Sequence, residues 1–159
     1  MKTGICSKIK AKVKVEVITL ILLLFSSLSV LSANAATYYV ATDGSDTNPG
    51  TITQPWQHIA WATCGGSYGC PITTNNPNKL KAGDTAYIRG GTYSENKIIF
   101  ANSGTAIQPI TIKNYQNETP VIDGGFSNNL AGQSIISVFV VDGKNYITFD
   151  GLEIMRGWR

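Results

Sequence analysis

The sequence lacks an apolar run long enough to anchor it stably across a membrane. Its longest run, Val17–Leu31, has 15 residues, whereas a spanning helix needs roughly 20. Five lysines precede this run, and small residues ending in Ala33-Asn34-Ala35-Ala36 follow it. A basic start, a short apolar segment and an A-x-A site predict a secretory signal peptide over residues 1–35, cleaved after Ala35. The alternative is an uncleaved signal anchor.

The predicted leader implies a secreted protein, extracellular or periplasmic, that meets a membrane only during export. It also removes the excess of basic residues. The chain has 13 Lys and Arg against 10 Asp and Glu, but five lysines and Glu16 belong to residues 1–35. Residues 36–159 keep eight basic and nine acidic side chains, a net charge of −1. This composition predicts no nucleic-acid partner, and its 124 residues suffice for one domain.

Cysteine and histidine are scarce. Cys6 leaves with the leader, so the mature part has Cys64, Cys70 and a single histidine, His58. Zinc centres need further Cys or His ligands at defined spacings, and none is expected here. An even pair of cysteines in an exported chain predicts a disulfide between Cys64 and Cys70. The loop that it closes is short and rich in glycine, so the bond would pin a surface loop and contribute little to the fold.

The mature part consists of short β-type runs separated by clusters of Gly, Asn, Asp and Pro. These runs predict strands at Thr37–Ala41, Thr85–Arg89, Ile98–Phe100, Ile110–Ile112, Val121–Ile122, Ile135–Val141, Ile147–Phe149 and Leu152–Ile154. One amphipathic helix is predicted over Pro55–Thr63, because Trp56, Ile59, Ala60 and Thr63 share a face.

The spacing of the runs predicts a solenoid. Ile88, Ile112 and Ile136 follow one another at intervals of 24 residues. A coil of about 24 residues with several short strands is typical of a β-solenoid, in which each coil buries its inner face by stacking on the next. About three coils fit between Thr85 and Arg159.

An antiparallel β-sandwich is the alternative fold. Asp142-Gly143 and Asp150-Gly151 are dipeptides that also form hairpin turns. The runs beside them are three to five residues long, which suits the corners of a coil better than a long hairpin ladder. Composition alone does not separate the two folds.

A set of segments between Thr37 and Ile154 is familiar from one group of proteins. It comprises Tyr38–Val40, Asp43–Thr51, Gln54–Trp56, Ala82–Tyr93, Pro109–Ile112, Pro120–Gly124 and Tyr146–Ile154. Together these segments resemble the entry and first coils of secreted right-handed parallel β-helix proteins of the pectate-lyase-like superfamily. This superfamily includes the chondroitinase-B and pectate-lyase-like polysaccharide lyases.

The resemblance implies an all-β, right-handed parallel β-helix whose open N-terminal end is capped by the helix at Pro55–Thr63. Residues 64–79 depart from the pattern as an insertion. Lyases of this kind pair a bound Ca²⁺, which neutralises a uronate carboxylate, with a Lys or Arg that abstracts the adjacent proton. Their catalytic groups lie on later coils, so the catalytic residues here are unknown. We therefore expect residues 36–159 to be a truncated, inactive part of such an enzyme, with Ca²⁺ and an acidic polysaccharide as ligands of the full-length protein.

An oxygen-rich turn is the candidate cation site within the sequence. Asp43, Ser45, Asp46 and Asn48 supply carboxylate and amide oxygens from one flexible loop, as Ca²⁺ sites require. Turn chemistry explains the same residues equally well. Four other acidic residues each lie beside glycine at a corner, where a side chain bonds the backbone; they are Asp84, Asp123, Asp142 and Asp150.

Four further residues are candidates for a saccharide groove, because aromatic faces stack on sugars and guanidinium groups bind carboxylates. They are Tyr87, Arg89, Arg156 and Trp158. His58 has no Ser, Cys or carboxylate at a recognisable motif spacing and is interpreted as a half-exposed residue of the predicted helix.

Three hypotheses of function follow. The first is an exported polysaccharide lyase or a related carbohydrate-active enzyme. The second is a non-catalytic surface or adhesion solenoid, and the third is a small carbohydrate-binding module with a sandwich fold. The architecture implied by the resemblance does not decide among them, because one fold serves many functions.

Overall fold

The computed structural model describes residues 34–63, 76–125 and 137–156, all of which belong to the unit Ala33–Arg159. The predicted disulfide and nearly all of the predicted leader lie outside these residues, so both stay predictions. The elements are β1 Thr37–Val40, α2 Ile59–Thr63, β2 Thr85–Ile88, β3 Gly91–Tyr93, β4 Ile98–Ile99, β5 Ile110–Asn114, β6 Pro120–Asp123, β7 Phe139–Val140, β8 Ile147–Asp150 and β9 Glu153–Met155. Within the described part of the chain, no helix is long and apolar enough to cross a membrane.

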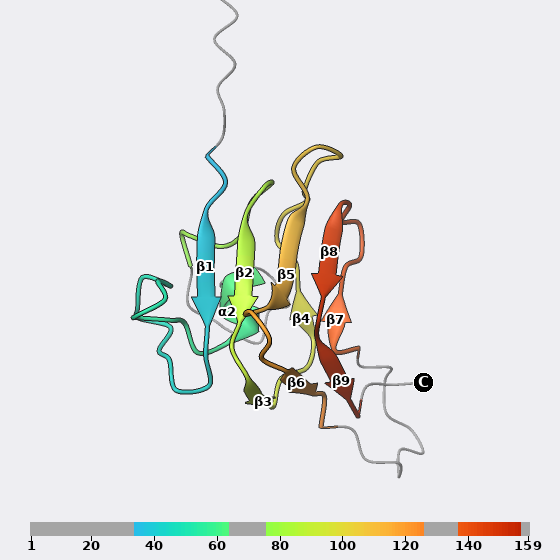
Figure 1. The fold of residues 1–159 in the computed structure, drawn as a ribbon. Helices are drawn as coiled ribbons and strands as arrows, with labels where there is room; N and C mark the ends of the chain where they lie inside the picture. The colour runs from blue at the N-terminus through green and yellow to red at the C-terminus, as the bar shows by residue number, and fades with distance from the viewer. Residues whose placement is uncertain (1–33, 64–75, 126–136, 157–159) are drawn as a thin grey trace, which may run out of the picture. The chain divides into compact units, whose positions relative to one another are not determined.

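The strands form three parallel sheets. The first sheet has the order β1-β2-β5-β8, the second β3-β6-β9, and the third pairs β4 with β7. Figure 1 shows the first sheet as four strands side by side, with β3, β6 and β9 following at the next corner. From β2 onward, each strand leads into a different sheet, and every third strand returns to the first sheet. This is the topology of a parallel β-helix with three strands per coil.

The pairing excludes the sandwich alternative. All strand pairs among the described residues are parallel, and the single antiparallel contact there is an isolated bridge between Thr105 and Gln108. The turn after Asp150 leads from β8 in the first sheet to β9 in the second, and the two strands do not pair with each other. A hairpin would have placed them side by side.

The predicted period of 24 residues is wrong. Ala86 pairs with Ile112, 26 positions later, and Ile112 pairs with Phe149, 37 positions later. Ile136, which the periodicity had placed opposite Ile112, lies outside the described residues. Most of the additional length lies in the sequence between Asp123, the end of β6, and Phe139, the start of β7.

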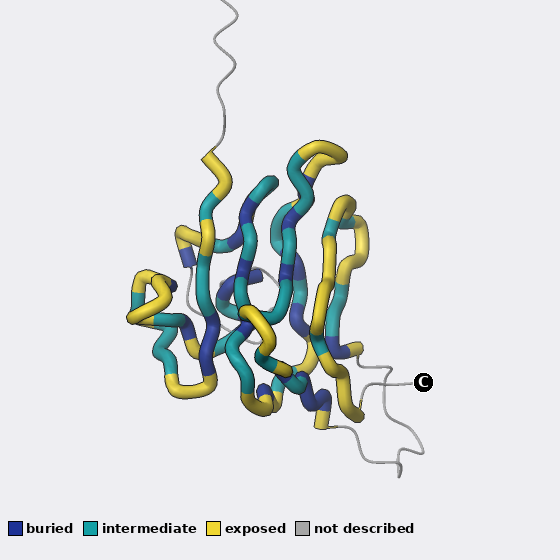
Figure 2. The backbone as a smooth tube through the Cα atoms, viewed as in Figure 1, coloured by how far each residue is buried: buried dark blue, intermediate teal, exposed yellow. Residues whose placement is uncertain are grey.

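Alternation along each strand builds the core. In β2, and in β5 as far as Ile112, every second residue is buried; these residues are Ala86, Ile88, Ile110 and Ile112. Because the register keeps like-facing residues opposite one another, these side chains form continuous rows through the coils. Figure 2 shows this buried interior along β2 and β5, whereas β8 and β9 are mostly exposed.

The helix is shorter than predicted. It spans Ile59–Thr63, and Pro55 to His58 precede it. The backbone at Trp56 is extended instead, because it forms a parallel bridge with Val40 and exchanges hydrogen bonds with Tyr39 and Ala41. α2 contacts β1 and β4, and four of its five residues are buried. Its role as a cap of the coil end stays a prediction.

Several strand ends also differ from the prediction. β3 was missed because a glycine-rich run has low strand propensity, and the strand exists because it pairs with β6. β4 and β7 are shorter than predicted, whereas β6 extends one residue further on each side. The predicted strand start at Ile135 is outside the described residues.

Candidate functional site

The outer face of the first sheet brings aromatic and charged side chains together. Tyr39, Tyr87, Lys113 and Asp150 occupy one register row across the four strands. Neighbouring strands lie about 4.8 Å apart, so adjacent members of the row are within contact distance. In β2 the neighbours of Tyr87, Ala86 and Ile88, are buried, and in β5 Ile112, the residue before Lys113, is buried. A row of polar and aromatic groups therefore crosses the coils.

Three tyrosines pack against one another on this surface. The rings of Tyr39 and Tyr87 are stacked with centroids 5.6 Å apart. Tyr115, just beyond β5, meets both rings edge-on, at 5.6 Å from Tyr39 and 5.9 Å from Tyr87. Such stacked and edge-to-face pairs hold aromatic rings in defined orientations. We call these three residues, with Arg89 and Lys113, the tyrosine face.

Arg89 is fixed beside the tyrosines by an ion pair. Its Nε donates to both carboxylate oxygens of Glu118, at 2.9 and 3.0 Å, and its guanidinium carbon lies 5.0 Å from the centre of the Tyr115 ring. Glu118 also accepts a hydrogen bond from the backbone N–H of Gly90 at 2.5 Å. The hydrogen bond with Arg89 lowers the pKa of Glu118 and, reciprocally, raises the pKa of Arg89. Arg89 is therefore a permanent cation here.

The Glu118 variant Glu118→Gln tests this ion pair. We expect the free energy of unfolding at neutral pH to fall by about 0.2–1 kcal/mol, because both partners are partly exposed. The pKa of Glu118 is lower in the folded state than in the unfolded chain. The ion pair therefore stabilises the protein fully when the pH is above the pKa of Glu118 in the unfolded chain, about 4.3. The stabilisation is lost as the pH falls through the pKa of Glu118 in the folded protein. In urea unfolding from pH 7 to pH 3, the free energies of unfolding of the wild type and of Glu118→Gln should converge. A difference that stays constant over this range would contradict this account.

Lys113 has a looser partner. Its Nζ lies 3.2 Å from a carboxylate oxygen of Asp150, whose side chain is 60% exposed. Lys113 also borders a shallow depression of about 290 Å³, lined by Tyr87, Lys113, Asn114, Tyr115 and Gln116. The depression thus combines two aromatic rings with a cation at the surface of the first sheet.

The oxygen-rich turn is occupied by backbone contacts. One oxygen of Asp46 accepts hydrogen bonds from the backbone N–H groups of Gln57 and His58, both at 3.0 Å. Asn48 donates its amide N–H to the carbonyl of Pro55, and Ser45 bonds Thr47. Among the residues that the structure describes, no group of three or more His, Cys, Asp or Glu side chains is arranged to hold a metal ion. Cation binding at Asp43, Asp46 and Asn48 stays a prediction.

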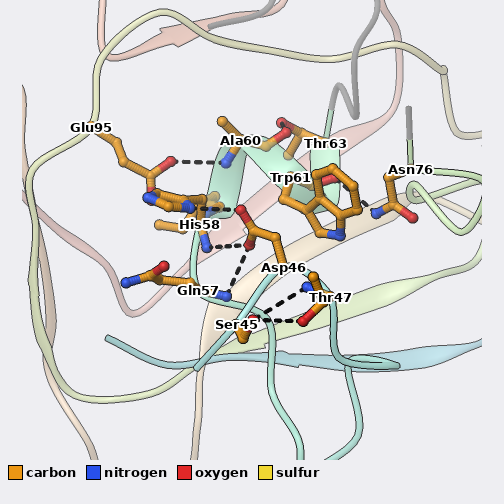
Figure 3. A network of polar contacts seen from close by, with 11 residues as sticks. Ser45, Asp46, Thr47, Gln57, His58, Ala60, Trp61, Thr63, Asn76 and Glu95 are labelled. Carbon is orange, nitrogen blue, oxygen red and sulfur yellow. Dashed lines mark hydrogen bonds and ion pairs between the residues drawn. The ribbon is translucent and has the colours of Figure 1, made fainter. Parts of the chain in front are cut away.

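His58 has a carboxylate partner that its sequence spacing did not indicate. Its Nδ1 lies 2.7 Å from the second oxygen of Asp46, twelve residues earlier in the chain, and its side chain is 44% exposed. Figure 3 shows Asp46 between His58 and the backbone of Gln57. His58 precedes α2 instead of lying within it.

Glu95 completes the polar network before α2. Its two carboxylate oxygens accept hydrogen bonds from the N–H groups of Ile59 and Ala60, both at 2.9 Å. These N–H groups belong to the first two residues of α2 and have no hydrogen-bond acceptor within the helix. Burial is the largest influence on Glu95 and raises its pKa, although the two N–H donors act in the opposite direction. Asp46 and Glu95 together satisfy four successive backbone N–H groups, from Gln57 to Ala60.

Three of the four predicted corner aspartates have polar partners in the structure. Asp84 accepts hydrogen bonds from the N–H groups of Ala36 and Lys81, both at 2.8 Å, and Asp123 accepts one from Gly125 at 3.0 Å. The structural interpretation of these two is confirmed. Asp123 also pairs with the side chain of Arg156, and Asp150 pairs with that of Lys113.

The predicted saccharide-groove residues are only partly brought together. Tyr87 and Arg89 both belong to the tyrosine face, whereas Arg156 follows β9 and forms an ion pair with Asp123 of the second sheet. The hydrogen bond with Asp123 raises the pKa of Arg156 and lowers that of Asp123. Trp158 lies outside the described residues. The sequence analysis did not identify Tyr39, Lys113 and Tyr115 as site residues. Of these, Tyr39 lies at an outward position of a predicted strand, Thr37–Ala41.

A family model decides the classification. The model described as "Pel9A-like, right handed beta helix region" matches residues 38–158. The chain belongs to this family. The parallel coil is therefore a right-handed β-helix, and the expectation of a pectate-lyase-like architecture is confirmed.

Two curated relatives share sequence with this β-helix region. The pectate lyase PEL9 of Emericella nidulans is 38% identical over 91 residues, which are 57% of this chain and 19% of that protein. The uncharacterized protein YwoF of Bacillus subtilis is 34% identical over 116 residues, 73% of this chain and 21% of that protein. The chain thus spans about a fifth of the length of these relatives.

Solved structures show the same architecture. A rhamnogalacturonan lyase superposes with a TM-score of 0.55 at 23% identity, covering 76% of this chain and 28% of the other. The GH136 lacto-N-biosidase of Eubacterium ramulus superposes with a TM-score of 0.53 at 25% identity, covering 75% of this chain and 20% of the other. At 23% identity, the first of these likenesses supports the fold alone.

Proposed function

We propose that this chain supplies the first coils of an exported polysaccharide lyase that acts on uronate-containing polymers. The observation that carries the proposal is the 38% identity to a pectate lyase over 91 residues of the β-helix region. The family match over residues 38–158 supports it, as does the basic, short apolar leader that is typical of exported proteins. The full-length protein is proposed to use Ca²⁺ together with a basic residue on coils beyond those described.

We further propose that the coils seen here do not perform the elimination themselves. A Lys or Arg base must lose its proton near neutral pH, which requires a lowered pKa. Arg89 and Arg156 are held by Glu118 and Asp123, and these hydrogen bonds raise the pKa of both guanidinium groups. The two arginines are therefore suited to binding an anion rather than to accepting a proton.

The experiment compares the 159-residue chain with the product of the longest reading frame that contains it. Ultraviolet absorbance of unsaturated products should increase with polygalacturonate when the longer protein is present with Ca²⁺. We expect no increase with the 159-residue chain, with or without Ca²⁺. Product formation by this chain alone would place the catalytic groups within it, contrary to the proposal.

A non-catalytic surface or adhesion β-helix is the alternative. If the longer protein yields no unsaturated product from polygalacturonate or from rhamnogalacturonan, yet binds either polymer, the lyase proposal is wrong and this alternative gains support. The control is a pectate lyase of known activity assayed in the same buffer.

A further inference from the structure

The depression on the tyrosine face has the composition of a sugar-binding site. Tyr87 and Tyr115 provide ring surfaces, Lys113 provides a cation, and Asn114 and Gln116 line the remainder. Aromatic rings contribute large contact areas, and tyrosine adds a hydroxyl that hydrogen-bonds at the edge of an apolar surface. Its volume of about 290 Å³ is at the lower end of the range for small-molecule sites.

The rings that line the depression are held in place before any ligand arrives. Tyr39 stacks on Tyr87 from the neighbouring strand, and Tyr115 meets both rings edge-on. Arg89 lies over the Tyr115 ring and is itself fixed by Glu118. Ordering of side chains on binding costs free energy, so a preformed surface binds more tightly than a mobile one.

Lys113 is the group of the depression that can bind an acidic ligand. Charged groups at or next to the depression include Lys113, Arg89, Glu118 and Asp150, which form two ion pairs. Glu118 is bonded to Arg89 and Gly90, whereas Asp150 is 60% exposed and touches Lys113 at 3.2 Å. An exposed ion pair of this kind is worth only about 0–1 kcal/mol. A ligand carboxylate can therefore replace Asp150 on Lys113 at small cost.

We propose that this depression is a non-catalytic binding subsite for one acidic sugar residue of a polysaccharide, with the sugar ring against Tyr87 and Tyr115 and its carboxylate on Lys113. The proposal takes its substrate class from the proposed function and adds where on this chain that class is bound. Asp150 acts as a competitor for Lys113. Its removal therefore strengthens binding, whereas removal of Lys113 weakens it.

The test measures dissociation constants of the 159-residue chain for trigalacturonate and for xylotriose by isothermal titration. Lys113→Met should weaken trigalacturonate binding about fivefold, which corresponds to about 1 kcal/mol, and Asp150→Asn should strengthen it several-fold. Tyr87→Ala and Tyr115→Ala should each weaken it about tenfold. Lys81→Met and Tyr146→Ala serve as matched controls, because both residues are exposed and lie outside the depression; neither should change the constant.

Three outcomes would overturn the subsite. The first is a dissociation constant for trigalacturonate that Lys113→Met and Tyr87→Ala leave unchanged. The second is an equal affinity of the chain for xylotriose and trigalacturonate, and the third is weaker trigalacturonate binding by Asp150→Asn. Circular dichroism and sedimentation establish that each variant is folded and has the association state of the parent chain. If the longer protein forms unsaturated product but this chain binds no trigalacturonate, the subsite fails and the proposed function stands. If this chain binds trigalacturonate but the longer protein forms no unsaturated product, the subsite stands and the proposed lyase function fails.

Discussion

Replacing Trp56 with alanine is expected to lower the free energy of unfolding by about 3–5 kcal/mol, the usual cost of truncating a buried tryptophan. Trp56 is 1% exposed, and its ring stacks on Tyr38 with centroids 4.5 Å apart. Its indole N–H donates to the carbonyl of Asn48 at 2.8 Å. The ring also packs on Gly50, where a Cβ atom would approach it to 2.6 Å. Alanine would leave a cavity between β1 and the turn that follows it.

Urea unfolding monitored by circular dichroism measures this loss. Trp56→Phe should cost less, because most of the buried area remains and only the indole hydrogen bond disappears. Ile107→Ala is the matched control, since Ile107 is 90% exposed and its truncation should change the free energy by less than about 0.5 kcal/mol. A loss below about 1 kcal/mol for Trp56→Ala would show that the Trp56 site collapses or contributes little to the core.

Glu95→Ala is expected to destabilise the protein by about 1–3 kcal/mol at pH 4, because the N–H groups of Ile59 and Ala60 lose their acceptors in a buried position. Burial raises the pKa of Glu95, so the folded protein retains the proton to a higher pH than the unfolded chain. The contribution of Glu95 is therefore full below the unfolded pKa, near 4.3, and decreases as the pH rises through the folded pKa. The difference between wild type and variant should narrow from pH 4 to pH 8.

Thermal unfolding of both proteins across this pH range provides the measurement. Glu95→Gln keeps one acceptor and buries no charge, so its loss should be smaller than that of Glu95→Ala. Ser94→Ala, at the exposed neighbouring position, is the control and should be neutral. A difference that widens toward pH 8 would mean that Glu95 is stabilised as an anion, and that its two N–H donors outweigh its burial.

The strand assignments show what composition predicts well. Strands were expected at Thr85–Arg89, Ile110–Ile112 and Ile147–Phe149, where β-branched and aromatic residues are concentrated, and β2, β5 and β8 lie there with slightly different ends. Gly91–Tyr93 was missed, and the helix began four residues later than expected. In both places tertiary pairing, of Tyr93 with Ile122 and of Trp56 with Val40, overrides the local propensity.

The candidate sites were predicted less completely than the strands. The tyrosine face combines residues from three coils, of which Tyr87 and Arg89 were expected and Tyr115 was not. Tyr115 lies beyond the end of β5, where no alternation pattern fixes its direction. Asp46 was expected as a cation ligand, and its contacts with Gln57 and His58 depend on a turn whose path the sequence does not specify.

The sequence by itself indicated short strands with polar corners, and its resemblance to β-helix proteins implied the parallel coil, whereas the parallel pairing that excludes a sandwich was decided by the tertiary structure. The sequence also determined which side chains of β2 and β5 face inward, because alternation has a fixed period of two. Only the tertiary structure decided the register, since a corner absorbs additional residues without altering the strands that it joins. Register in turn sets which distant residues meet. The pairing of Glu95 with Ile59, 36 residues apart, follows from it and from no local pattern.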